Sequence, residues 1–172
     1  MSRGFVKEED QEEAPFIPPR AALPPGQTNY VTERGMRLLE EEKAALEQQR
    51  SSNKQENDTE RRRTNMEIDG KIRLLNERLS SARIIDINEQ PKDEVRFGAT
   101  VKYRINSREF TITIVGVDEA DVKEGRVAFV APLIKAMSGK KVGEELTFDM
   151  GGKQVPIKIL AIDYQKLSNK KG

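Results

Sequence analysis

The sequence contains no cysteine and no histidine among its 172 residues. Their absence excludes disulfides, the usual zinc sites, cysteine nucleophiles and every catalytic triad that uses histidine. Acid–base chemistry would have to use carboxylates, lysine or tyrosine, and a bound metal would need oxygen ligands, which suit magnesium. Aromatic residues are also scarce, at 5%, and there is no tryptophan.

Long apolar runs and a strong net charge are missing as well. No apolar stretch approaches the roughly 20 residues of a membrane span, and the N-terminus lacks the build of a signal peptide. We therefore expect a cytoplasmic protein with no membrane partner. Lys plus Arg (30) nearly equals Asp plus Glu (29), which argues against broad nucleic-acid binding through a basic face.

Composition divides the chain into five segments. Residues 1–29 carry the acidic run KEEDQEE and then the proline-rich stretch PFIPPRAALPPG, which predicts a disordered N-terminal tail, with a short docking peptide at Phe5, Phe16 and Ile17 as the alternative. Residues 30–86 are rich in Leu, Glu, Arg, Lys and Gln, a composition typical of helices. We expect a linker over 87–93, a globular domain over 94–165 and a C-terminal tail over 166–172.

Two apolar stripes predict that the helical segment is an antiparallel hairpin. Thr32 is suited to cap the first helix, and Leu39 and Leu46 follow one heptad apart. The second stripe steps by four, three, four and three residues, as in the a/d seam of a coiled coil: Ile68, Ile72, Leu75, Leu79 and Ala82.

The stretch 47–65 between the stripes has no apolar residue. We place the turn of the hairpin within 51–58, with Asn57 and Glu60 as a capping box for the second helix. Because burial rather than propensity usually stabilises helices, this end is expected to be solvated and mobile.

From Val95 onward the apolar period changes to two, which predicts short half-buried strands. Asn106-Ser107 and Gly151-Gly152 are signals for hairpin turns, and PLIKAMSG predicts a short helix that starts at Pro132 and stops at Gly139. The fold class is therefore α+β, with a helical hairpin followed by a small, mainly antiparallel β-domain.

Asp118-Glu119-Ala120-Asp121 are the letters of a nucleotide-hydrolysing helicase box. Such a site needs a phosphate loop of the form GxxxxGK[ST]. The nearest candidate, residues 139–141, lacks both the earlier glycine and a following hydroxyl residue. An ATPase is therefore not supported, and the tetrapeptide predicts either a solvated acidic turn or an acidic surface that faces a partner.

Taken in order, the motifs YVTERG, LSSARIID, FGATV, IVGVDEAD, PLIKAM and GKKVGEE resemble the bacterial Gre transcript-cleavage factors (GreA and GreB). The resemblance implies a coiled-coil hairpin followed by an FKBP-like domain. It implies that this domain docks at the rim of the secondary channel of bacterial RNA polymerase, with DNA binding as part of the transcription role. The partner-binding candidates are Asp118, Glu119, Asp121 and Pro132.

In the same family the hairpin enters the channel, and acidic tip residues help to hold the second magnesium ion of the polymerase's own active site. The candidates in this chain are Glu56, Asp58 and Glu60. Two metals can clamp the attacking and leaving oxygens of a phosphodiester, so the chain would share Mg²⁺ with the polymerase and bind no cofactor stably itself. It would be a monomer with no catalytic residue of its own.

Three consecutive arginines, Arg61, Arg62 and Arg63, lie beside the predicted tip. They are candidates for contacts with the nascent RNA 3′ end or with the channel walls. Alternatively, they form a solvated helix face paired with nearby acids.

The chain departs from the family pattern at three places. The tip signature GDxxEN is represented by residues 53–57, NKQEN, without the leading aspartate. The hairpin also looks shorter by roughly one heptad per arm, and Val130-Ala131-Pro132 lacks the family's serine before proline. Two interpretations follow: a factor that stimulates cleavage, or a non-cleaving paralogue that modulates or inhibits the polymerase from the same channel.

Two other classes of function are alternatives. The FKBP-like domain suggests a peptidyl-prolyl isomerase, but such an enzyme needs an aromatic-lined pocket, and aromatic residues are few. The hairpin is also consistent with a coiled-coil module that binds a partner other than polymerase. The preferred hypothesis is a transcription elongation factor that is not itself an enzyme.

Overall fold

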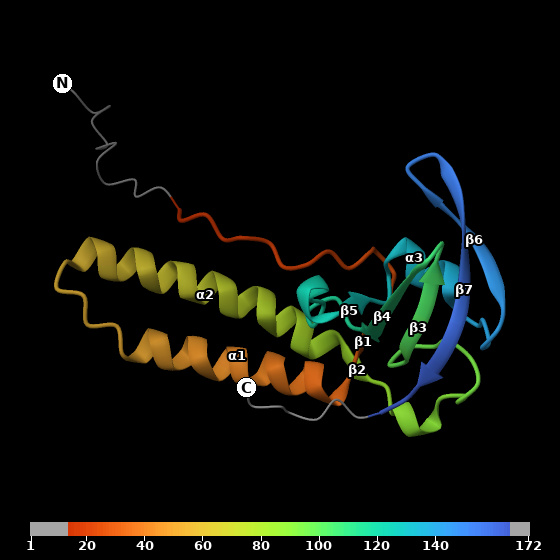
Figure 1. Cartoon of the computed structure of the whole chain (residues 1–172). Coiled ribbons are helices and arrows are strands. Elements are labelled where there is room, and N and C mark those ends of the chain that lie inside the picture. Colours follow the sequence, from red (N-terminus) through yellow and green to blue (C-terminus); the bar gives the residue numbers. More distant parts are fainter. Residues whose placement is uncertain (1–13, 166–172) are drawn as a thin grey trace.

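The computed structural model describes residues 14–165, which form a helical hairpin joined to a five-stranded sheet (Figure 1). This arrangement confirms the α+β class. The predicted C-terminal tail and the first 13 residues lie outside the described residues. None of the helices within residues 14–165 combines the length and the hydropathy that a membrane-spanning helix needs.

The hairpin consists of α1 (Glu33–Ser51) and α2 (Asp58–Ser81), which run antiparallel and side by side (Figure 1). The side chain of Thr32 accepts a hydrogen bond from the Gly35 amide at 2.9 Å, which confirms the predicted N-cap of α1. Asn57 caps α2 in the same way. The turn therefore falls within 51–58, as predicted.

Apolar packing in the hairpin is concentrated near its base. Leu39 and Leu75 are buried together with Val31, and Ile68 is also buried. Leu38, next to Leu39, is 38% exposed, so only one of the two leucines faces the partner helix. The structure thus shows a helical hairpin, while regular coiled-coil packing along its length stays a prediction.

A two-stranded parallel sheet closes the base of the hairpin. It pairs β1 (Asn29–Val31) with β2 (Ala82–Ile84). The buried Asn29 side chain donates to the Arg78 carbonyl at 3.1 Å and to Ser81 Oγ at 3.2 Å. The sequence did not reveal these strands, because three residues are too few to show a period of two.

The larger sheet has the strand order β5-β4-β3-β7-β6, and all neighbours are antiparallel except β4 and β5. Asn106, with φ of 55°, turns β3 into β4, and Gly151 and Gly152 turn β6 into β7, so both predicted hairpin turns are confirmed. The strands are β3 (Thr100–Ile105), β4 (Arg108–Val115), β5 (Arg126–Ala128), β6 (Glu145–Met150) and β7 (Lys153–Asp163).

One face of this sheet is covered by α3 (Pro132–Met137), which begins at Pro132 as predicted. Gly139 follows the helix with φ of 79°, a left-handed conformation that glycine adopts without strain. Buried Ile134 and Met137 pack on the sheet residues Val101, Ile112, Ile114, Ile157 and Ile159. The FKBP-like description of this sheet domain (residues 94–165) stays a prediction.

Two short 3-10 helices complete the fold. One, η2 (Ile87–Glu89), lies in the segment expected to link the two parts of the chain. The other, η3 (Val122–Glu124), directly follows the acidic tetrapeptide, and Asp121 caps it by accepting from the Lys123 amide at 3.2 Å.

Residues 14–28, which we call the strap, form neither helix nor strand but lie along the hairpin (Figure 1). The sequence predicted a disordered tail over 1–29, whereas the strap makes defined side-chain contacts and Asn29 already belongs to β1. Prolines remove backbone donors and so prevent regular pairing. They do not prevent docking through the side chains between them.

Candidate functional site: the hairpin tip

The loop between α1 and α2 is held by the side chain of Asn53. Its Nδ2 donates to the Arg61 carbonyl at 3.3 Å and to Asn65 Oδ1 at 3.1 Å, and its Oδ1 accepts from the Gln55 amide at 3.3 Å. A carboxylate cannot donate either of the first two bonds. The amide at this position, where the family signature has aspartate, therefore has a structural role in this chain.

The three carboxylates predicted to assist a metal lie at this tip and are exposed. Asp58 pairs with Arg61 in the first turn of α2, whereas Glu56 forms no ion pair with a described residue. Residues 14–165 contain no group of three or more His, Cys, Asp or Glu side chains that could hold a metal ion.

The three arginines beside the tip differ in their surroundings. Arg61 donates to the Gln55 carbonyl at 3.1 Å and pairs with Asp58, so it supports the loop. Arg62 and Arg63 are exposed on α2. The side chain of Thr64 adds a bond to Gln55 Oε1 at 3.1 Å. Polar contacts thus order the tip where apolar packing is missing.

A further polar contact joins the two helices below the tip. Arg50 donates to both carboxylate oxygens of Asp69, at 2.5 and 3.1 Å. This hydrogen bonding lowers the pKa of the Asp69 carboxyl and raises the pKa of the Arg50 guanidinium from their ordinary values. Both side chains are about half exposed, so solvent screens the pair.

The placement predicted for Asp118 and Glu119 is wrong, because neither side chain lies on an exposed acidic surface. Their exposed fractions are 6% and 2%. Glu119 Oε2 accepts from Arg34 Nη1 at 2.9 Å, and Oε1 accepts a short hydrogen bond from the Thr32 hydroxyl. Asp118 accepts from Arg20 at 2.9 Å. These carboxylates face inward because the hairpin and the strap supply arginines that neutralise them.

Asp121 and Pro132, the other two partner-binding candidates, remain at the surface. The Asp121 side chain is 45% exposed and lies 3.7 Å from the Arg126 guanidinium. Pro132 is exposed at the start of α3. The tetrapeptide 118–121 is therefore divided between an internal junction and a surface turn.

Three aromatic rings from distant parts of the chain meet near α3. The ring of Tyr30 lies 5.5 Å from that of Phe129 and 6.1 Å from that of Phe97. They line a cavity of about 380 Å³ together with Ile134 and Lys135. Although aromatic residues make up only 5% of the sequence, the fold brings these three rings together.

Comparison with known proteins identifies the family of the chain. Residues 90–164 match the family described as transcription elongation factor GreA/GreB, C-terminal. The chain is 34% identical over 108 residues to transcription elongation factor GreB of Neisseria meningitidis serogroup B. It belongs to the GreA/GreB family. Transcription elongation factor GreA of Acidiphilium cryptum is 38% identical to this Gre-family chain over 99 residues.

These two matches cover 62% and 56% of the chain and 66% and 63% of the relatives, so the chain spans just under two thirds of their length. A solved structure of GreA/GreB from Nitrosomonas europaea is 21% identical, with a TM-score of 0.39, and covers 80% of this chain and 99% of that one.

Proposed function

We propose that this Gre-family chain is a transcription elongation factor that binds bacterial RNA polymerase. Its hairpin enters the secondary channel, and Glu56, Asp58 and Glu60 stimulate the polymerase's own cleavage of backtracked RNA. The observation that carries the proposal is the exposed tip, which presents carboxylates at the end of a projecting hairpin (Figure 1). The family membership and the names of the curated relatives support the role in transcription.

The dimensions of the hairpin suit insertion into a channel. At 1.5 Å per residue, the 19 residues of α1 extend about 28 Å. The slender pair of helices ends in a loop without bulky apolar side chains. Such an arm can carry its tip well away from a sheet domain that stays at the channel rim.

The chemistry of the tip suits a shared metal rather than a resident one. Magnesium prefers oxygen ligands in octahedral geometry and keeps several waters. Glu56 has no ion-pair partner among the described residues, so its carboxylate can approach an external Mg²⁺ without first breaking a contact. Asp58 would have to leave its ion pair with Arg61 before its carboxylate could bind the metal. In the polymerase, Mg²⁺ would then help to polarise the water that attacks the RNA phosphodiester.

In this proposal, the sheet domain docks at the rim of the secondary channel of the polymerase. Asp121 and Pro132 lie on its exposed surface and stay the candidates for contact with the channel rim. Asp118 and Glu119 are instead used inside the chain. Arg62 and Arg63 are candidates for contact with the RNA 3′ end or the channel walls. We expect the chain to act as a monomer in the cytoplasm, without catalytic activity of its own.

A second candidate function is a non-cleaving modulator that occupies the same channel. It is favoured by Asn53, whose amide is engaged in the loop and supplies no carboxylate. A neutral amide oxygen binds magnesium more weakly than a carboxylate. With one acid fewer at the tip, the hairpin would block or reshape the channel without supporting hydrolysis.

The test is a cleavage assay on a stalled and backtracked elongation complex formed with the cognate polymerase. The chain is added with Mg²⁺, and short 3′ RNA fragments are measured. The variant E56A/D58A/E60A should abolish the fragments, while the control E40A/E41A/E47A, which removes exposed acids from α1, should retain them. Binding without cleavage would reject the cleavage factor in favour of the modulator. No binding at all would reject both.

A further inference from the structure

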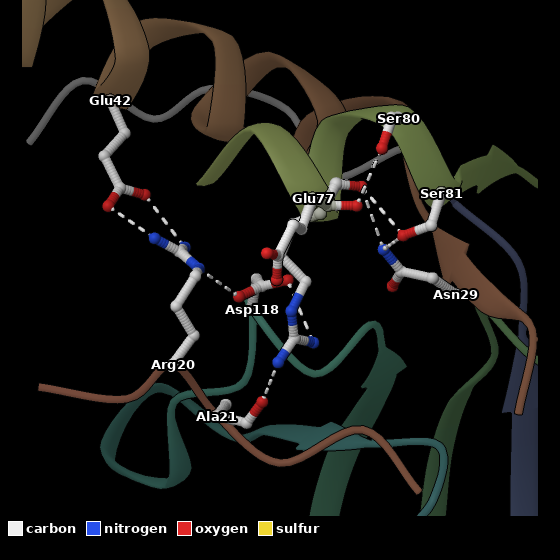
Figure 2. Close-up of polar contacts among 9 residues, drawn as sticks. Arg20, Ala21, Asn29, Glu42, Glu77, Ser80, Ser81 and Asp118 are labelled. Atoms are coloured by element: carbon white, nitrogen blue, oxygen red, sulfur yellow. Dashed lines mark hydrogen bonds and ion pairs between the residues drawn. The ribbon is translucent and has the colours of Figure 1, made fainter. Parts of the chain in front are cut away.

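A single strap residue, Arg20, connects the hairpin to the sheet domain. Its Nη1 and Nη2 donate to the two oxygens of Glu42 on α1 at 2.7 and 3.0 Å, and its Nε donates to Asp118 Oδ1 at 2.9 Å (Figure 2). Because the guanidinium donates to both oxygens of one carboxylate, the two planar groups hold each other in a fixed orientation. Arg20 thus holds α1 in a defined relation to the loop that follows β4.

The buried Asp118 depends on this arginine. Asp118 Oδ2 and Arg78 Nη1 lie 3.6 Å apart, and neither atom has a hydrogen-bond partner within residues 14–165. The hydrogen bond from Arg20 is therefore the only one that the Asp118 side chain receives from the described part of the chain. Loss of Arg20 would leave a buried carboxylate with one long ion pair, a costly state.

The strap is seated on α2 on both sides of Arg20. On one side, Ile17 packs against Gly70, where an added Cβ would lie 2.7 Å from Ile17 Cγ1. On the other side, the Arg78 guanidinium donates a short hydrogen bond to the Ala21 carbonyl (Figure 2). The prolines between Ile17 and Arg20 reduce the conformational freedom that the strap loses on docking.

Apolar packing between the hairpin and the sheet domain is interrupted beneath the strap. A cavity of about 450 Å³ lies beneath the strap, between Leu46 and Leu74 of the hairpin and Val117 of the sheet domain. This open space supplies no packing contacts beneath the strap, so polar links there help to hold the angle between the two parts. Arg20 supplies such a link from a third segment.

We propose that Arg20 is a positioning residue: with the strap, it sets the angle between the hairpin and the sheet domain and so the place of the tip. The angle itself does not depend on polymerase. Its consequence for the reach of the tip rests on the proposed function. In the cleavage assay, a chain with a loosened junction would bind polymerase but deliver its carboxylates less often.

The absence of native cysteine allows a direct test on the free, full-length chain. Spin labels are attached at Glu47→Cys on α1 and Thr111→Cys on β4, both exposed sites, and the distance between them is measured by double electron–electron resonance. The parent chain should give one narrow distribution. Arg20→Gln should broaden and shift it, and so should Ile17→Asp, which unseats the strap without touching the ion pairs.

Arg73→Gln is the matched control, because it removes an arginine from an exposed ion pair on α2, with Glu77, and should leave the distribution unchanged. If Arg20→Gln loses helical circular dichroism, Arg20→Lys replaces it, since lysine keeps the charge without the planar fork. Unchanged distributions in the folded Arg20 and Ile17 variants would overturn the proposal. Because polymerase is absent, this outcome is independent of whether the proposed function holds.

Discussion

Glu119 Oε2 accepts a hydrogen bond from Arg34 Nη1 at 2.9 Å across 85 residues of sequence. The bond joins the loop after β4 to the first turn of α1. The same carboxylate also accepts a hydrogen bond from the hydroxyl of Thr32, the residue that caps α1. The Glu119 side chain is 2% exposed. A motif that looks like a surface acidic turn in the sequence is therefore part of the junction between the two halves of the molecule.

Glu119→Ala should lower the free energy of unfolding by about 2 to 3 kcal/mol, because it leaves the largely buried Arg34 and Thr32 without their acceptor. Urea denaturation measures the change. Glu124→Ala, on the exposed 3-10 helix that follows, is the control and should stay within about 0.5 kcal/mol of the parent. Equal effects of the two substitutions would contradict a junction role for Glu119.

Gly116→Ala should also destabilise the junction, since the new Cβ would lie 2.6 Å from the Tyr30 carbonyl oxygen, a backbone atom of β1. Overpacking of this kind costs about 1 to 3 kcal/mol. Gly70→Ala is the matched control: the three atoms nearest to its added methyl group belong to the Ile17 side chain rather than to the backbone, and α-helices favour Ala over Gly by about 1 kcal/mol. Thermal unfolding should show a larger loss of stability for Gly116→Ala than for Gly70→Ala. The reverse order would show that Gly116 does not lie close to the Tyr30 carbonyl oxygen.

Asn53→Asp should loosen the tip rather than improve it, although it restores the acid of the family signature. The new carboxylate would face the Arg61 carbonyl and Asn65 Oδ1, which are both acceptors. A loss of about 1 kcal/mol would speed amide hydrogen exchange over residues 52–57 by about fivefold. Asn76→Asp, on an exposed face of α2, should leave exchange at the tip unchanged. Slower exchange in Asn53→Asp would show that the amide does not hold the loop.

The ion pair between Arg50 and Asp69 should be visible in a pH titration followed by NMR. The hydrogen bond from Arg50 lowers the pKa of Asp69 in the folded chain. The stabilisation is therefore present above the unfolded pKa of about 3.9 and is lost as the pH falls through the lower folded value. In Arg50→Gln the Asp69 carboxyl should titrate at its ordinary pKa. An unchanged titration curve in that variant would show that the pair does not form in solution.

Local signals in the sequence predicted the elements that local chemistry determines. Thr32 and Asn57 cap helices where capping residues were expected, and Asn106 and Gly151 turn hairpins where turn residues were expected. Each of these features depends on neighbours only a few residues away, so a single sequence contains the information. The α+β class follows from the change of apolar period near Val95.

Contacts between distant segments could not be predicted in the same way. Asp118 and Glu119 meet arginines 98 and 85 residues away, and no local pattern distinguishes those arginines from others on the surface. The strap was expected mainly as a disordered tail for a related reason. Its prolines exclude regular structure, and docking through Ile17 was only the alternative, because its partners on α2, and those of Arg20 on α1, are not visible in the sequence. At the tip, the place of the turn was predicted, and the role of Glu56, Asp58 and Glu60 toward a metal stays a prediction. The structural role of the Asn53 side chain depends on contacts that only the fold shows.

In the proposed function, the tip of the hairpin reaches the catalytic centre of RNA polymerase. A photocrosslinker on Gln55→Cys, in a chain without other cysteines, tests it in a backtracked complex with a labelled RNA 3′ end. We expect crosslinks from position 55 to the RNA end or to the polymerase active centre, and none from the control Lys153→Cys on the sheet domain. A bound chain that crosslinks to these targets from position 153 but not from position 55 would contradict it.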